Sequence, residues 1–256
     1  MLAARLGLGV LALLLGAGAT GAEELVWSTP LAVADVLGGD RLVLADGRSI
    51  RLAGLRLPAG NASLAEQARA KLTSLLAGHA VRLGTTAAPI DRYGDLVAQV
   101  ERDDGQWLQG ALLEEGLALV QTGPGDSARA AAMLALERSA RERRLGLWAD
   151  PALGPQDAAR LADAIGSFQI VQGRVRRVAR AGDYVYLNFG ADWRSDFTIR
   201  VLAEIEDRFE QAGLDLRKLA GRRIEVRGFV LDAGGPLIEL SGPEQIQILP
   251  AAAAGD

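Results

Sequence analysis

The chain has 256 residues, which is enough for one large domain or two small ones. Hydrophobic residues make up 49% and charged residues 23%, a composition typical of a folded protein. The formal net charge is −4, whereas a protein that binds nucleic acid over its whole surface has a strongly positive net charge. With no cysteine and one histidine, His79, disulfides and multi-histidine metal sites are excluded. We interpret His79 as a surface or helix-capping residue.

The first 22 residues predict a signal peptide. Arg5 supplies a positive charge, residues 6–15 are apolar, and Thr20, Gly21 and Ala22 form a small-residue cleavage site. The apolar run is short for a membrane span, although an uncleaved N-terminal anchor is the alternative. We therefore expect an exported bacterial protein, periplasmic or secreted, with no membrane span in its mature part.

Residues 23–150 predict the element order β-β-β-α-β-β-α-β-α. Strands are expected over 31–37, 41–44, 49–55, 80–83, 91–101 (after a turn) and 117–120, and helices over 63–77, 107–116 and 127–145. Ser63, followed three residues later by Glu66, has the pattern of a helix-capping box. Short strands closed by helices fit a small barrel of the oligonucleotide/oligosaccharide-binding (OB) type.

A second β-rich segment follows a linker expected over 151–166, in which 156–165 could form a short helix. Its strands are expected over 169–178, 184–189, 197–201, 222–230, 236–240 and 244–249, with a helix over 204–212. The predicted fold class is mainly β with α: two tandem OB-like barrels, over 23–150 and 167–250. Residues 251–256 are expected to be a disordered tail.

Basic and aromatic residues gather near the start of the second barrel. The candidates for contact with single-stranded nucleic acid are Arg174, Arg176, Tyr184, Tyr186 and Trp193. Alternation along a strand places the two tyrosines on one face, where bases could stack while arginines contact phosphates. The alternative is that the aromatic side chains fill the barrel core and the arginines are ordinary surface charge. Another basic run, 138–144, is expected to be a solvated helix face.

Several short motifs occur in a recognisable order. They are Gly39-Asp40, Arg51-Leu52, Pro58, Asp91-Arg-Tyr-Gly94 and Arg144-Leu-Gly-Leu-Trp148. Together they resemble the thermonuclease (staphylococcal-nuclease-like) family over residues 33–148. The resemblance implies an OB barrel and hydrolysis of phosphodiesters, in which carboxylates hold calcium, a glutamate directs water and two arginines stabilise the transition state. The second segment resembles the C-terminal domain often appended to bacterial members, which brings no established ligand.

Carried over by position, the resemblance makes Asp40 a metal ligand and Arg51 a catalytic arginine. The other three functional positions differ: Arg56 stands at the second metal aspartate, Ala59 at the glutamate and Asp95 at the second arginine. An arginine beside Asp40 is expected to form an ion pair and repel calcium, the family's cofactor. The resemblance therefore implies a degenerate nuclease site.

Three functions remain open from the sequence. The first is an exported member of the family that binds a ligand or single-stranded nucleic acid with lost or residual hydrolysis. The second is an active metal-dependent nuclease whose carboxylates have moved to Asp91, Asp95 or Glu66. The third is an envelope protein-interaction module without catalysis.

Overall fold

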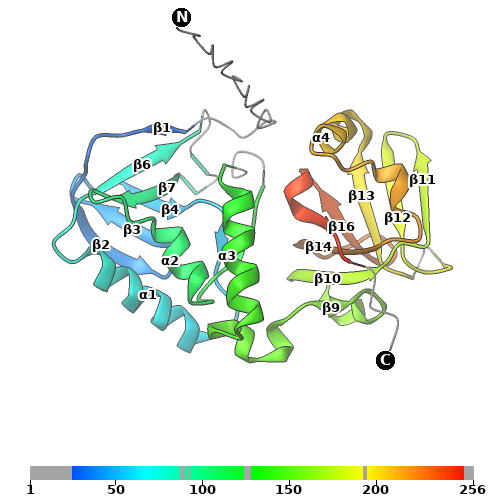
Figure 1. Ribbon diagram of the computed structural model, residues 1–256, viewed down its shortest axis with the longest axis horizontal. Coiled ribbons are helices and arrows are strands. Elements are labelled where there is room, and N and C mark those ends of the chain that lie inside the picture. Colours follow the sequence, from blue (N-terminus) through cyan, green and yellow to red (C-terminus); the bar gives the residue numbers. More distant parts are fainter. Residues whose placement is uncertain (1–24, 87–89, 92, 124–127, 193–194, 251–256) are drawn as a thin grey trace, which may run out of the picture.

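A computed structural model describes residues 25–86, 90–91, 93–123, 128–192 and 195–250 (Figure 1). The predicted signal peptide, the predicted tail, Ser127 and Trp193 lie outside these residues. The described part is mainly β, with several sheets and four α-helices, as the composition of the predicted elements implies. None of the helices in these ranges is both long and apolar enough to span a membrane.

The first half, the described residues up to 150, contains a six-stranded sheet in the order β1-β6-β7-β4-β3-β2. Its strands are Val26–Trp27 (β1), Val33–Gly38 (β2), Arg41–Leu44 (β3), Ser49–Leu52 (β4), Val81–Thr85 (β6) and Leu96–Arg102 (β7). All pairings are antiparallel except that of β4 with β7. Side chains alternate between the two faces of β3: Leu42 and Leu44 are buried, while Arg41 and Val43 are partly exposed.

The strand expected over 49–55 is divided in two. After β4, a turn containing Gly54 at a φ of +73° redirects the chain, a conformation that glycine adopts without strain. The second piece is β5 (Leu55–Arg56), which pairs with β8 (Leu119–Val120) in a separate two-stranded sheet. This break carries Arg56 away from the strand that bears Arg51.

Three helices pack on the first half: α1 (Ala62–Leu76), α2 (Leu108–Glu114) and α3 (Ala130–Glu142). The capping prediction for α1 is wrong. Asn61 rather than Ser63 is the N-cap, and its side-chain oxygen accepts from the backbone N–H of Leu64 at 3.0 Å. Asparagine caps helices as well as serine does, so the helix begins two residues earlier than a cap at Ser63 would allow. The buried face of α1 carries Leu64 and Leu72, as its periodicity predicts.

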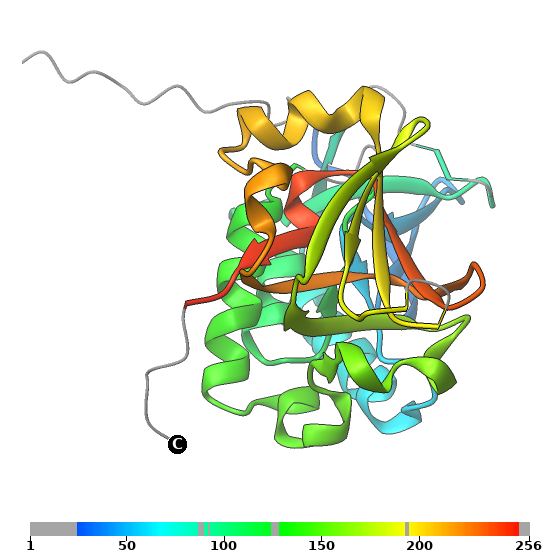
Figure 2. The ribbon, with the colours of Figure 1, turned by 90° about the vertical axis from the view of Figure 1, so that its right-hand side faces the viewer.

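The second half, the described residues from 156 onward, contains two sheets, in the orders β17-β14-β10-β9 and β11-β12-β13-β16-β15. The strands are Gln156–Asp157 (β9), Phe168–Arg174 (β10), Arg177–Ala181 (β11), Tyr184–Asn188 (β12), Thr198–Leu202 (β13), Arg223–Phe229 (β14), Leu231–Asp232 (β15), Pro236–Leu240 (β16) and Ile246–Ile248 (β17). The helix α4 (Glu206–Gln211) covers one end, and the segment that joins the halves covers the other (Figure 2).

Two expectations for this half are wrong. The strand expected over 169–178 is two strands, β10 and β11. The N–H of Val175 donates to the carbonyl oxygen of Arg222, and the N–H of Arg176 donates to that of Asn188. The chain therefore passes from one sheet to the other between these two residues. The short helix expected over 156–165 is instead β9, parallel to β10, followed by the short 3-10 helices Ala158–Arg160 and Ala162–Ala164. Asp157 favours this arrangement because its carboxylate accepts from the N–H of Ala159.

Part of the strand order recurs in the two halves. In each, the third strand of an antiparallel series pairs in parallel with a strand that comes later in the chain: β4 with β7, and β13 with β16. The buried apolar side chains form two clusters, one mainly in each half, and Ile170 of the second half belongs to the first cluster. The first half is an OB-like barrel fold; closure of the second into a barrel, and the domain boundaries, stay predictions.

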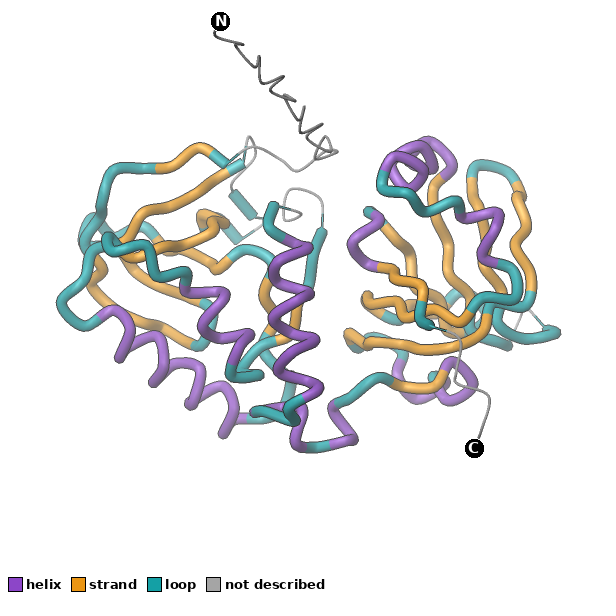
Figure 3. Tube along the Cα trace, viewed as in Figure 1, coloured by secondary structure: helices purple, strands orange, loops and turns teal. Residues whose placement is uncertain are grey.

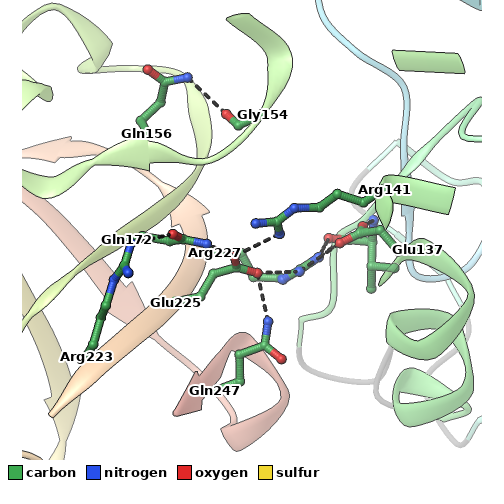
Figure 4. A network of polar contacts seen from close by, with 10 residues as sticks. Glu137, Arg141, Gly154, Gln156, Gln172, Arg223, Glu225, Arg227 and Gln247 are labelled. Carbon is green, nitrogen blue, oxygen red and sulfur yellow. Dashed lines mark hydrogen bonds and ion pairs between the residues drawn. The ribbon is translucent and has the colours of Figure 1, made fainter. Parts of the chain in front are cut away.

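The helix α3 stands between the halves (Figures 1 and 3). Two of its charged side chains contact β14 of the second half. Glu137 and Arg227 form an ion pair at 2.8 Å, with 3% and 4% of their side chains exposed. Arg141 donates to Glu225 of β14 at 2.8 Å (Figure 4). The expectation that 138–144 is a solvated face is therefore wrong for Arg141, because its partner comes from a segment 84 residues away.

Candidate functional site

A cleft of about 760 Å³ brings together most of the positions that the family resemblance singles out. Its lining includes Asp40, Arg41, Arg51, Arg56, Ala59, Asp91, Tyr93, Gln121 and Phe229. The turn after β2 supplies Asp40, β4 supplies Arg51 and β5 supplies Arg56. Phe229 comes from β14, so the second half forms part of the wall.

Arg51 lies against Asp91. Its Nε is 3.1 Å from the Asp91 carboxylate, with both side chains largely buried. Asp91 also accepts from the backbone N–H groups of Tyr93 and Asp95. Burial alone would raise the pKa of Asp91, but these N–H groups and Arg51 outweigh it and hold the pKa below its usual value. Asp91 is thus an ionised, structurally committed carboxylate that orients Arg51.

Arg56 does not form the ion pair with Asp40 that the sequence suggests. Its guanidinium carbon is 4.8 Å from the ring centre of Phe229 and 5.5 Å from that of Phe168. Its Nη1 donates to Gln121 at 3.2 Å. The faces of aromatic rings attract a cation, so two rings of the second half hold the side chain for which the resemblance predicted a metal-ligand position. Burial lowers the pKa of Arg56, and the charge of Asp40 opposes that effect.

Asp40 is half-buried in the cleft. Its burial raises the pKa, although the charges of Arg41 and Arg51 act in the opposite direction. A carboxyl group with a raised pKa and two cationic neighbours is a weak ligand for a divalent metal. Asp95, at the second arginine position, is buried and pairs with Arg41 at 3.1 Å.

The cleft does not fit calcium. That ion needs six to eight oxygen ligands, roughly, and the cleft offers the carboxylates of Asp40 and Asp91, the second already bonded to Arg51. Within the described ranges, the group of three side chains close enough to share an ion is His79, Asp103 and Asp104. It lies outside the cleft lining, where His79 contacts Asp103 at 2.9 Å.

An active nuclease would need other carboxylates in the cleft, and the candidates named from the sequence do not all lie there. Asp91 is in the cleft, whereas Glu66 is on the exposed side of α1 and pairs with Arg69. Ala59 lines the cleft at the glutamate position and has no group that could direct water.

The candidates for nucleic-acid contact in the second half lie on two surfaces. Arg174 and Arg176 line a second cavity, whose lining includes neither tyrosine. Tyr184 and Tyr186 share one face of β12, with ring centres 6.0 Å apart, and are half-buried. The same-face prediction is confirmed. Arg200, which the sequence analysis did not select, lies 4.7 Å from the Tyr184 ring centre. Binding of nucleic acid by these residues stays a prediction.

Four cleft residues were missed by sequence reasoning: Arg41, Tyr93, Gln121 and Phe229. Arg41 directly follows the motif Gly39-Asp40, and Tyr93 is part of the motif that begins at Asp91, so these motifs were the available signal. Nothing in the sequence near Phe229 marks it, because the contact depends on how the second half docks.

The comparison with protein families agrees with this geometry. The family described as Staphylococcal nuclease homologue matches residues 49–150, which include Arg51, Arg56 and Asp91 and run from β4 to the end of the first half. No curated protein matches the chain. The match ends at residue 150, and Asp40 and the second half lie outside it. Residues 49–150 are therefore a thermonuclease-like domain of the staphylococcal nuclease homologue family.

Proposed function

We propose that the protein is an exported member of the nuclease family that binds single-stranded nucleic acid in the Arg51 cleft, with hydrolysis lost or residual. The observation that carries this proposal is the combination of three arginines with two exposed aromatic side chains in one cleft. The exposed fractions of Tyr93 and Phe229 are 69% and 42%. Proteins that hold single strands combine phosphate contacts by cations with stacking of bases on aromatic rings.

The loss of hydrolysis follows from the groups that are missing. Removal of one well-aimed electrostatic group typically raises a reaction barrier by about 3–4 kcal/mol. The second metal ligand, the glutamate and the second arginine are replaced by Arg56, Ala59 and Asp95. Even with incomplete additivity, these three changes reduce the family reaction by several orders of magnitude.

An active nuclease is the second candidate, and one observation favours it. Asp91 is an ionised carboxylate beside Arg51 in the cleft. Its oxygens already accept from Arg51 and from two backbone N–H groups, which leaves little capacity for a metal ion.

A binding and cleavage assay tests the proposal. Residues 23–256 are titrated with a labelled single-stranded DNA at several salt concentrations, with calcium or with a chelator. We expect saturable binding that weakens with salt, is unaffected by calcium and leads to no cleavage. Arg51→Ala and Tyr93→Ala should each weaken binding, while Arg69→Ala on the exposed side of α1 should not.

Two outcomes would contradict the proposal. Calcium-dependent cleavage that disappears in Arg51→Ala would establish the active nuclease. Absence of any interaction with single strands would favour the protein-interaction module. Export is tested separately, by fractionation of cells that express the full chain.

A further inference from the structure

The second half contains a cavity of about 770 Å³ that shares no lining residue with the Arg51 cleft. It lies between the segment 155–161, which includes β9, and the strands β10 and β14. Three arginines line it: Arg174, Arg176 and Arg223. The volume is within the range of about 300–1,000 Å³ that is usual for small-molecule sites.

Two of these arginines face one another across a β-ladder. Arg174 and Arg223 are directly opposed in the antiparallel pairing of β10 with β14. Like charges in this position destabilise a sheet, because opposed side chains lie close together. In the described part of the chain, no carboxylate forms an ion pair with Arg174, Arg176 or Arg223.

The hydrogen bonds of these arginines go to neutral acceptors. Arg174 donates to the carbonyl oxygen of Gly221 at 2.7 Å. Arg223 donates to the side-chain oxygen of Gln172 at 3.2 Å, as Figure 4 shows. These contacts hold the guanidinium groups in place without neutralising them, and each group keeps further N–H donors.

The two carboxylates in the lining are engaged by backbone groups. Asp157 accepts from the N–H of Ala159 at 2.8 Å, and Asp196 accepts from the N–H of Asp192 at 2.8 Å. They shape the loops at the cavity edge and leave the positive charge of the opposed arginines in place.

The back of the cavity is apolar and closely packed. Phe189 and Phe197 line it, with ring centres 4.9 Å apart. At Gly173 a side-chain Cβ would lie only 2.7 Å from both Phe189 and Ala158, so glycine is needed for this wall to close. The cavity therefore combines one aromatic wall with a polar, cationic edge.

We propose that this cavity binds a small phosphate monoester. The phosphate dianion bridges Arg174 and Arg223, with Arg176 as a third contact, and removes the repulsion between the opposed strands. Arginine suits this role because its planar fork donates two parallel N–H groups to phosphate oxygens. The apolar part of the ligand lies against Phe189, which distinguishes the ligand from inorganic phosphate.

Calorimetric titration of residues 23–256 with phenyl phosphate tests the site, with inorganic phosphate as a second probe. We expect saturable binding that is tighter for phenyl phosphate than for inorganic phosphate. Arg174→Gln and Arg223→Gln should each weaken it about tenfold or more, because each removes a charge-assisted contact. Arg180→Gln is the matched control, since this exposed arginine is outside the lining. Absence of saturable binding, or equal loss in the control, would overturn the proposal.

A charge reversal separates binding from folding. Arg174→Glu replaces the like-charged pair by an opposed ion pair with Arg223, so the ligand-free protein should melt at a higher temperature than the wild type. The same variant should no longer bind phenyl phosphate. A lower melting temperature, or retained binding, would refute the role assigned to the opposed arginines.

The result is independent of the Arg51 cleft. Arg51→Ala should bind phenyl phosphate as the wild type does. If an oligonucleotide without a terminal phosphate displaces phenyl phosphate from that variant, a backbone diester is the ligand and the monoester assignment is wrong.

Discussion

The ion pair between Glu137 and Arg227 offers a quantitative test of how the two halves are held together. Arg227 places Nη2 2.8 Å from one oxygen of Glu137 and donates through Nη1 to the other at 3.1 Å. The same Nη1 donates to the carbonyl oxygen of Val120 at 3.0 Å. The substitution Arg227→Met keeps most of the side-chain volume but removes the positive charge. Glu137 then stays buried as a charged group, and among the described residues it accepts a hydrogen bond from the backbone N–H of Val120.

Removal of one partner from a buried ion pair typically costs about 3–5 kcal/mol. We expect this loss in the free energy of unfolding of Arg227→Met, measured by urea denaturation at pH 7. The double variant Glu137→Gln/Arg227→Met should recover most of it, because the amide oxygen still accepts from Val120 while the uncompensated charge is gone. Arg69→Met, which removes an exposed pair, should leave the free energy of unfolding nearly unchanged.

Two results would refute this reasoning. One is a loss below about 1 kcal/mol in Arg227→Met, which would mean that water reaches Glu137 and that the contact is not buried in solution. The other is a double variant no more stable than the single one, which would assign the loss to packing rather than to charge.

Three further predictions concern other parts of the fold. Asn61→Ala should lower the free energy of unfolding by about 1 kcal/mol and Ser63→Ala by much less, as thermal melts of both variants would show. Gly116→Ala should lower the free energy of unfolding by at least about 2 kcal/mol in denaturant titrations. Gly116 has a φ of +66°, and a Cβ there would lie 2.2 Å from the carbonyl oxygen of Leu145. An unchanged free energy would disprove that close approach. Burial would raise the pKa of Glu225, but hydrogen bonds from Gln172 and Arg141 hold it below its usual value. The ionised Glu225 therefore stabilises the fold above the unfolded pKa of about 4.3, and this contribution is lost as pH falls through the lower folded pKa. The difference in free energy of unfolding between the wild type and Glu225→Gln should therefore narrow below about pH 4. A difference that widens there would contradict this sign.

The sequence was informative wherever local patterns decide the structure. Alternating and helical periodicities placed β3, β12, α1 and α3 close to their observed bounds. The order of short motifs identified the first domain, and alternation placed Tyr184 and Tyr186 on one face.

The errors arose where distant segments decide. Arg141 was assigned to a solvated face because its helix is rich in charge, and only the docking of β14 shows that Glu225 accepts from it. Arg56 was expected beside Asp40, but Phe168 and Phe229 provide the ring faces that hold it. Neither contact has a local signal, since each joins segments more than 80 residues apart.

The enclosure of Arg56 restricts which side chains this position can carry. An aspartate there would place a carboxylate against two aromatic ring faces, which carry partial negative charge, and would remove the cation that they hold. Such a variant should be less stable than the present protein while the second half stays docked. The two phenylalanines of the second half therefore decide, from a distance in the sequence, what the cleft of the first half can contain.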